Sequence, residues 1–189
     1  MSIFHRKLIV VDMQNDFIDG PLGSPAAQAI VPKVKEKIQK YLDSCEPIYF
    51  TRDTHFDNYS STYEGRKLPI KHCLEFSKGW EVHRDLISIF SDNNKIKYVD
   101  KQTFGYEFWH CIFSHDMDFY LNHGDDVMIE IVGVCTDICV VTNALILHTL
   151  YPEAEIIVDA ACCAGTTPEA HKAALQVLKS CQIKVINEE

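Results

Sequence analysis

The segment from Ile131 to Val140, IVGVCTDICV, contains the side chain with the clearest chemical potential, the thiol of Cys139. An apolar strand pattern runs into a sharp turn, and a predicted helix opens at the cysteine. N–H groups at a helix start lack intrahelical partners and carry partial positive charge. They favour the thiolate, which attacks carbonyl carbons, and they can hold the resulting oxyanion. We therefore predict a nucleophile at Cys139, with Cys135 in the loop contributing mainly its backbone N–H.

Two charged residues from distant parts of the chain are candidates to assist this thiol. Asp12 and Lys101 each follow an apolar strand pattern. Ligands gather beyond the carboxyl ends of parallel strands, so both residues are predicted to lie beside Cys139. The carboxylate could accept the thiol proton and pass it to a departing amine, while the ammonium holds both anionic groups. Taken singly, an aspartate there is more often a turn former and a lysine more often a solvated surface group, and Asp16 competes for the role of Asp12.

Residues 52–80 show little periodicity and contain four potential metal ligands. A loop of that length inside a compact domain is usually functional. Asp53, His55, Glu64 and His72 offer carboxylate oxygens and imidazole nitrogens, which suit Zn²⁺, Fe²⁺ or Mn²⁺. A lone histidine in a polar loop is usually just exposed, but Asp-x-His with two further donors is more specific. We predict one divalent metal ion here, zinc in preference to iron or manganese.

Strand and helix patterns alternate along the rest of the chain. Strands are predicted at 7–11, 47–51, 96–99, 127–132, 155–158 and 183–186, and helices around 30–42 and at 113–121, 137–150 and 168–180. Thr167 and Pro168 form a favourable helix start. The alternation implies an α/β protein with a parallel sheet and helices on both faces. No internal repeat or interdomain linker is visible, so residues 1–189 are predicted to form a single domain.

Length and composition limit the classes of function. A chain of 189 residues with 47% hydrophobic content can bury a sizeable core. The formal net charge of −9 argues against a nucleic-acid or anionic-membrane partner. Neither an export signal nor a bilayer-length apolar run is visible, and the 8 cysteines form no CxxC pair. A reduced, cytoplasmic protein is expected.

Together these segments resemble the isochorismatase-like cysteine hydrolases, and among them the nicotinamidases. The resemblance is carried by LIVVDMQNDF at 8–17, TRDTH at 51–55, the His72-Cys73 pair, Lys101 with the following QTF, and GVCTDICV at 133–140. Each motif is weak alone, but their order and spacing are specific. The resemblance implies a three-layer α/β/α fold with a six-stranded parallel sheet and a catalytic triad of Asp12, Lys101 and Cys139. It also implies a cis peptide at Val134–Cys135, which turns the N–H groups of Cys135 and Cys139 toward an oxyanion.

The resemblance also bears on the metal and the ring-binding residues. Nicotinamidases commonly hold their metal with one Asp and three His, but Ser61 stands where the third histidine is expected. Glu64 is the nearest substitute, similar to a carboxylate variant of the site in some bacterial members. The aromatic residue that often precedes the His-Cys pair is also missing. Phe17 and Phe104, with Tyr106, are therefore predicted to sandwich a flat pyridine ring.

The leading hypothesis is a nicotinamidase that hydrolyses nicotinamide to nicotinate and ammonia through a Cys139 thioester and serves NAD salvage. Pyrazinamide, a near-isostere of nicotinamide, is expected to fit the same pocket, and the family resemblance favours a homo-oligomer. One alternative is a metal-independent amidohydrolase of another small amide or N-carbamoyl compound, which the metal loop disfavours. A true isochorismatase would leave Cys139 without a purpose. A further alternative is a non-catalytic metal-binding or thiol-sensing module, but this hypothesis does not explain why Asp12 and Lys101 are placed at the same edge as Cys139.

Overall fold

The centre of the molecule is a six-stranded parallel sheet, seen in a computed structural model that describes residues 4–88, 95–122 and 125–188. The strands lie in the order β3-β2-β1-β4-β5-β6. Their bounds are β1 Phe4–Val11, β2 Ile48–Asp53, β3 Ile96–Lys101, β4 Asp126–Val134, β5 Glu155–Ala164 and β6 Lys184–Ile186. Every neighbouring pair is parallel, which confirms the predicted fold class.

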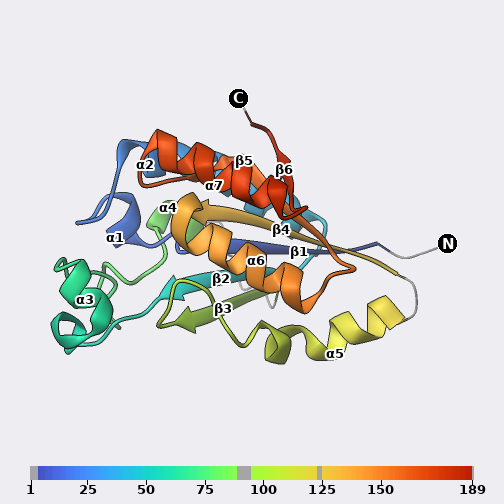
Figure 1. Ribbon diagram of the computed structural model, residues 1–189, viewed down its shortest axis with the longest axis horizontal. Coiled ribbons are helices and arrows are strands. Elements are labelled where there is room, and N and C mark those ends of the chain that lie inside the picture. Colours follow the sequence, from blue (N-terminus) through green and yellow to red (C-terminus); the bar gives the residue numbers. More distant parts are fainter. Residues whose placement is uncertain (1–3, 89–94, 123–124, 189) are drawn as a thin grey trace.

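Helices connect the strands and cover both faces of the sheet (Figure 1). They are α1 Asn15–Ile18, α2 Pro25–Asp43, the 3₁₀ turn η1 Tyr59–Ser61, α3 Tyr63–Lys67, α4 Arg84–Ile87, α5 Trp109–Asn122, the π-helical turn η2 Thr136–Val140, α6 Val141–Leu150 and α7 Pro168–Ser180. The predicted cap of α7 is present, since the Thr167 hydroxyl accepts a hydrogen bond from Ala170 N at 3.1 Å. Ser24 caps α2 in the same way.

Alternating residues of β1 explain why the sheet has two covered faces. Successive strand side chains point to opposite faces. Leu8 and Val10 pack in the cluster that includes α2 and α4, whereas Ile9 and Val11 pack with α5, α6 and α7. Because β1 is apolar on both faces, it can occupy only the interior of the sheet.

Beyond shifts of a few residues at element ends, such as α5 beginning at Trp109, the structure differs from the predicted elements as follows. The segment at 52–80 contains η1 and α3, and α1 and α4 are additional single-turn helices that are too short to show periodicity. β5 continues to Ala164 rather than ending at Val158. The helix predicted from Asp137 begins at Thr136 as a π-helical turn, in which Val140 N donates to Cys135 O at 3.0 Å.

The close approach of β1 and β4 places the segment that follows β1, with Asp12, beside the segment that follows β4, with Cys139. The chain order changes direction between these strands, which is where α/β sheets form ligand crevices. Gly133 has φ +121°, and a Cβ there would lie 2.1 Å from Val11 O, so only glycine fits. One residue further along, the peptide bond Val134–Cys135 is cis, as the resemblance implied.

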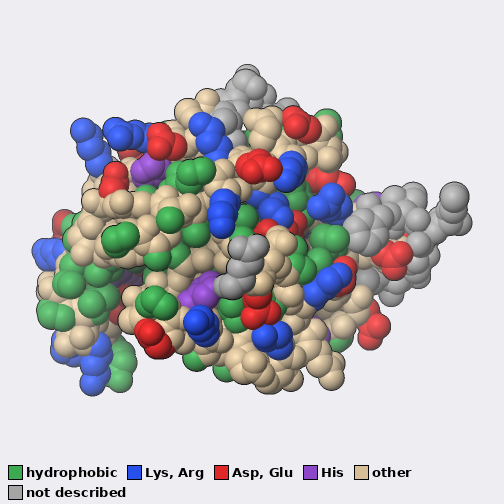
Figure 2. Space-filling view, turned by 90° about the horizontal axis from the view of Figure 1, so that it is seen from above, with side chains coloured by type: hydrophobic (Ala, Val, Ile, Leu, Met, Phe, Trp, Pro, Cys, Tyr) green, Lys and Arg blue, Asp and Glu red, His purple; other side chains and the backbone are tan. Residues whose placement is uncertain are grey.

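The surface carries both signs of charge. Figure 2 shows acidic and basic side chains intermingled on one face, with hydrophobic side chains gathering toward the end where α1 and α3 lie. Within the described ranges, no helix is long and apolar enough to cross a membrane.

Candidate active site

Asp12, Lys101 and Cys139 meet at the carboxyl edge of the sheet, although they come from three distant parts of the chain. Lys101 Nζ lies 2.7 Å from Asp12 Oδ2 and 3.7 Å from Cys139 Sγ. All three side chains are buried. The three residues follow β1, end β3 and follow β4, respectively, so the sheet itself brings them together.

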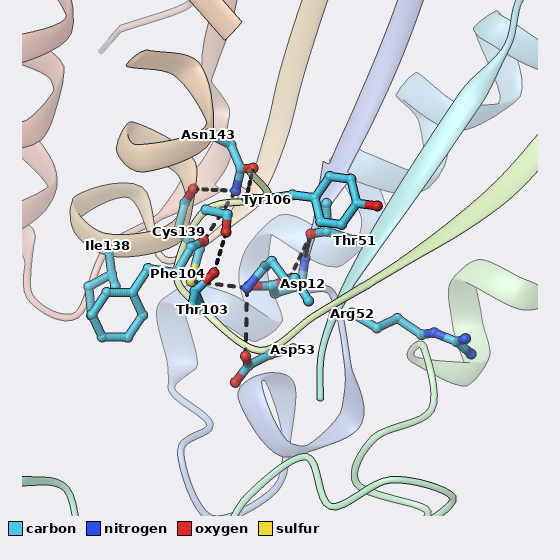
Figure 3. Close-up of polar contacts among 12 residues, drawn as sticks. Asp12, Thr51, Arg52, Asp53, Thr103, Phe104, Tyr106, Ile138, Cys139 and Asn143 are labelled. Carbon is cyan, nitrogen blue, oxygen red and sulfur yellow. Dashed lines mark hydrogen bonds and ion pairs between the residues drawn. The ribbon is translucent and has the colours of Figure 1, made fainter. Parts of the chain in front are cut away.

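Thr51, for which the sequence predicted no role, holds Asp12 in place (Figure 3). Asp12 lies just beyond β1 with φ 48°. Its N–H donates to Thr51 O at 3.2 Å and to Thr51 Oγ1 at 3.1 Å. The Thr51 hydroxyl donates to Asp12 Oδ1 at 2.6 Å. One oxygen of the carboxyl is thereby fixed by Thr51, and the other faces the ammonium.

Burial has a large effect on the pKa values of Asp12, Cys139 and Lys101. Burial raises the pKa of Asp12, and Lys101 only partly offsets that effect. Burial also raises the pKa of the Cys139 thiol well above its ordinary value, against the opposing effect of Lys101. Burial alone would lower the pKa of Lys101, but Asp12 and Cys139 raise it, so the ammonium stays charged.

The Cys139 thiol therefore holds its proton more tightly than the sequence predicted. Cys139 is the fourth residue of η2, and Cys135 is the N-cap, so the cysteine sits one turn inside the helix rather than at its opening. Burial there outweighs the effect of the Lys101 ammonium, which alone would lower the pKa of the thiol. The resting side chain is a thiol, and its reaction requires a nearby group that accepts the proton.

Asp53, His55, Glu64 and His72 form one cluster, as predicted. His55 Nε2 lies 2.9 Å from Asp53 Oδ2 and 3.6 Å from Glu64 Oε1, and His72 Nε2 lies 3.4 Å and 3.9 Å from the same two oxygens. A tetrahedral ion with bonds of about 2.1 Å separates its ligand atoms by about 3.4 Å. Among the described residues, the buried His55 Nε2 has no well-aligned hydrogen-bond partner. The four residues fit a single divalent ion.

Neighbouring groups orient these ligands. His72 Nδ1 lies 2.8 Å from Ile70 O, which leaves Nε2 to face the cluster. The buried amide of Gln14 accepts a hydrogen bond from Asp53 N at 2.7 Å and donates to Asp53 O at 2.9 Å. Asp16, which competed with Asp12 for the role of proton acceptor, accepts a hydrogen bond from Cys73 N at 2.7 Å and so supports the loop beside His72.

A cavity of about 360 Å³ adjoins both groups. Its lining includes Phe17, Phe104, Cys135, Cys139, Asp53, Glu64 and His72. Tyr106, also predicted to contact the ring, is not among these lining residues, and its role stays a prediction. Its ring packs against Trp109, with centroids 5.4 Å apart, and its backbone N–H donates to Asn143 Oδ1 at 3.0 Å. All 8 cysteines are free thiols in the structure.

Residues 7–189 match the family model described as the isochorismatase domain. The chain belongs to the isochorismatase family. Its curated relatives include a nicotinamidase from Saccharomyces cerevisiae, 28% identical over 219 residues, with 96% of this chain and 99% of the relative covered.

Solved structures agree with this membership. A nicotinamidase/pyrazinamidase from Bacillus subtilis superposes with a TM-score of 0.78 at 22% identity, covering 97% of this chain and 100% of that one, which shows the fold. A pyrazinamidase from Pyrococcus horikoshii in complex with zinc has a TM-score of 0.75 at 27% identity, covering 97% and 99%. The protein is therefore an isochorismatase-family hydrolase, similar to the nicotinamidases, with a possible metal-binding group at Asp53, His55, Glu64 and His72.

Proposed function

We propose that this isochorismatase-family hydrolase is a nicotinamidase that converts nicotinamide to nicotinate and ammonia. The observation that carries the proposal is the contact of the Lys101 ammonium with both Asp12 and Cys139. Cys139 lines a cavity of about 360 Å³ that three of the four candidate metal ligands also line. The yeast nicotinamidase and the zinc-bound pyrazinamidase support the same substrate class. Five points stay predictions: hydrolysis of pyrazinamide, a role in NAD salvage, a cytoplasmic location, a homo-oligomeric state and a single-domain organisation.

The substrate is held between aromatic and polar groups. Phe17 and Phe104 line the cavity and offer faces to the flat pyridine ring. A metal ion bound by Asp53, His55, Glu64 and His72 would supply a Lewis acid for the ring nitrogen. Holding the ring in this way fixes the carboxamide beside Cys139, and such orientation contributes a large part of the rate.

Cys139 and Asp12 carry out the first half of the reaction. The sulfur bonds to the carboxamide carbon while its proton passes to the Asp12 carboxylate. The N–H groups of Cys135 and Cys139 stabilise the oxyanion. The carbon–nitrogen bond then breaks, Asp12 returns the proton to the nitrogen, and ammonia leaves behind a thioester. Lys101 keeps its charge and stabilises the carboxylate whenever Asp12 is ionised.

Water completes the reaction. Asp12, again a carboxylate, takes a proton from water as the water oxygen attacks the thioester carbon. The carbon–sulfur bond breaks, the proton returns to sulfur, and nicotinic acid leaves, losing its remaining proton to solvent as nicotinate. Each turnover consumes one water and restores the thiol of Cys139 and the carboxylate of Asp12.

Ammonia and nicotinate release from nicotinamide tests the proposal. The wild-type protein is expected to form both products in equal amounts, and Cys139→Ala is expected to form neither. Cys45→Ala, which removes an exposed thiol, is the matched control and should retain full activity. Activity in the Cys139→Ala protein would exclude the thioester route. Release of ammonia from an N-carbamoyl amine but not from nicotinamide would point to the alternative substrate class.

A further inference from the structure

Asn143 is a fully buried amide that the reaction steps above do not use. It lies on α6, one helical turn after Cys139. Its Oδ1 accepts hydrogen bonds from Tyr106 N at 3.0 Å and Trp109 Nε1 at 2.9 Å. Its Nδ2 donates to Cys139 O at 2.8 Å and to Phe104 O at 3.2 Å (Figure 3). An amide side chain accepts two and donates two hydrogen bonds, so its capacity is filled.

The orientation of this amide is fixed by its partners. Tyr106 N and Trp109 Nε1 can only donate, and the carbonyls of Cys139 and Phe104 can only accept. Exchanging Oδ1 and Nδ2 would leave all four buried contacts unmade. Asn143 is therefore a rigid bridge between the backbone of the nucleophile and the 104–109 segment.

Phe104 is the residue in that segment on which the bridge bears most directly. Its ring lines the cavity of about 360 Å³ beside Cys139 and also an adjoining cavity of about 570 Å³ beside His55 and Glu64. The residue is 48% exposed, so packing on its own side chain does little to hold it. Its backbone carbonyl is held by Asn143 instead.

We infer that Asn143 is a positioning residue that sets Phe104 relative to the Cys139 sulfur and so aligns the ring of a flat carboxamide substrate for attack. The inference rests on the proposed function for its substrate. A misplacement of about 1 Å at such a site lowers a rate by about 100-fold. The bridge thus affects both substrate binding and alignment, although Asn143 touches no reacting atom.

The variant Asn143→Asp separates the two halves of the bridge. It keeps both acceptor contacts and removes the donors to Cys139 O and Phe104 O. Trp109→Phe is the matched control, because it removes one buried donor to the same side chain and leaves Cys139 and Phe104 bridged. We expect Asn143→Asp to lower kcat/KM for nicotinamide by about 10- to 100-fold, with KM raised. Trp109→Phe should lower Tm while KM stays near that of the wild type.

A double-mutant cycle with Phe104→Leu tests the route through Phe104. If Asn143 acts by placing that ring, the loss in kcat/KM caused by Asn143→Asp should be much smaller in the Phe104→Leu background. Equal losses in both backgrounds would overturn the inference. So would kinetics of Asn143→Asp that match those of Trp109→Phe at the same Tm.

Alkylation of Cys139 by iodoacetamide, itself a small carboxamide, gives a readout that does not need turnover. Its rate should change in Asn143→Asp and stay unchanged in Trp109→Phe. If the wild type fails to hydrolyse nicotinamide, the proposed function fails, and the alkylation rates still decide whether the bridge places the thiol. If Asn143→Asp does not fold, Asn143→Ser takes its place. Failure of both to fold, with Trp109→Phe folded, would show a purely structural residue and overturn the inference.

Discussion

Lys101 Nζ lies 2.7 Å from Asp12 Oδ2, and both side chains are 1% exposed. The same ammonium lies 3.7 Å from Asp53 Oδ1 and 3.7 Å from Cys139 Sγ. One buried cation therefore touches the proposed proton acceptor, the proposed nucleophile and a candidate metal ligand. Because these groups share a site with little access to water, each interaction is stronger than it would be at the surface.

Removing this cation is expected to weaken both the fold and the reaction. Lys101→Met leaves the Asp12 carboxyl buried without its partner, which should lower the free energy of unfolding by about 3 kcal/mol and abolish ammonia release. Urea denaturation and a product assay measure the two effects. Lys40→Met is the control, because its partner Glu36 lies 2.9 Å away in an exposed pair on α2. Equal destabilisation by both substitutions would contradict the assigned importance of Lys101.

Metal content tests the ligand cluster independently of activity. The wild-type protein is expected to bind one divalent ion per chain. Glu64→Ala should weaken that binding by about 100-fold or more, because even the loss of a group that only orients a ligand lowers metal affinity by about 10- to 100-fold. Chelation should also lower the Tm of the wild type, because the ion binds only the folded chain. Glu75→Ala, an exposed carboxylate in the same loop, should bind metal normally. A chelated protein with full activity would favour the metal-independent alternative.

Gly133→Ala should disrupt the crevice between β1 and β4. The new Cβ would lie 2.1 Å from Val11 O, and the backbone has φ +121°. We expect a loss of at least about 2 kcal/mol in unfolding free energy. Gly105→Ala is the matched comparison, since the atoms nearest to its Cβ would be side-chain atoms of Ile146 and Thr142 rather than backbone, and its φ is not positive. Thermal denaturation of both variants measures the difference, and a Gly133→Ala protein as stable as the wild type would show that the close approach is not required.

A second buried ion cluster, away from the candidate site, predicts how stability depends on pH. Lys37 Nζ contacts Glu130 Oε1 and lies 2.8 Å from Asp159 Oδ2, and Tyr41 OH donates to Glu130 Oε2 at 2.7 Å. Burial alone would lower the pKa of Lys37, but Asp159 and Glu130 raise it above its ordinary value of 10.5. Burial alone would raise the pKa of Asp159, but Lys37 holds it below its ordinary value of 3.8.

The sign of the effect follows from these two directions. A lowered carboxyl pKa stabilises the fold above pH 3.8, and that stability is lost as the pH falls through the folded pKa. A raised ammonium pKa stabilises the fold below pH 10.5, and that stability is lost as the pH rises through the folded pKa. The gap in unfolding free energy between wild type and Lys37→Met should therefore be widest between those limits and narrow outside them. Lys184→Met, which breaks an exposed pair with Glu155, should show a nearly constant gap, and a constant gap for Lys37→Met would refute the cluster's role.

The succession of elements was predictable because it depends on local patterns. Apolar runs such as Leu8–Val11 indicate strands buried on both faces, and the Thr167–Pro168 pair indicates a helix start. The rule that ligands gather at the carboxyl ends of parallel strands then placed Asp12, Lys101 and Cys139 at one edge. Their contact distances bear out that placement, while their catalytic roles stay predictions.

Periodicity and spacing along the chain are enough to predict the strand–helix alternation, the residue types that could do chemistry and the edge of the sheet at which they lie. The surroundings of each of these residues become visible only in the folded chain. The hydrogen bonds from Thr51 to Asp12, the contacts of Asn143 with the 104–109 segment and the raised pKa of the Cys139 thiol all depend on burial or on contacts between residues far apart in sequence. Such contacts leave no periodic trace, since a hydrogen bond across the fold constrains two positions and not the pattern between them.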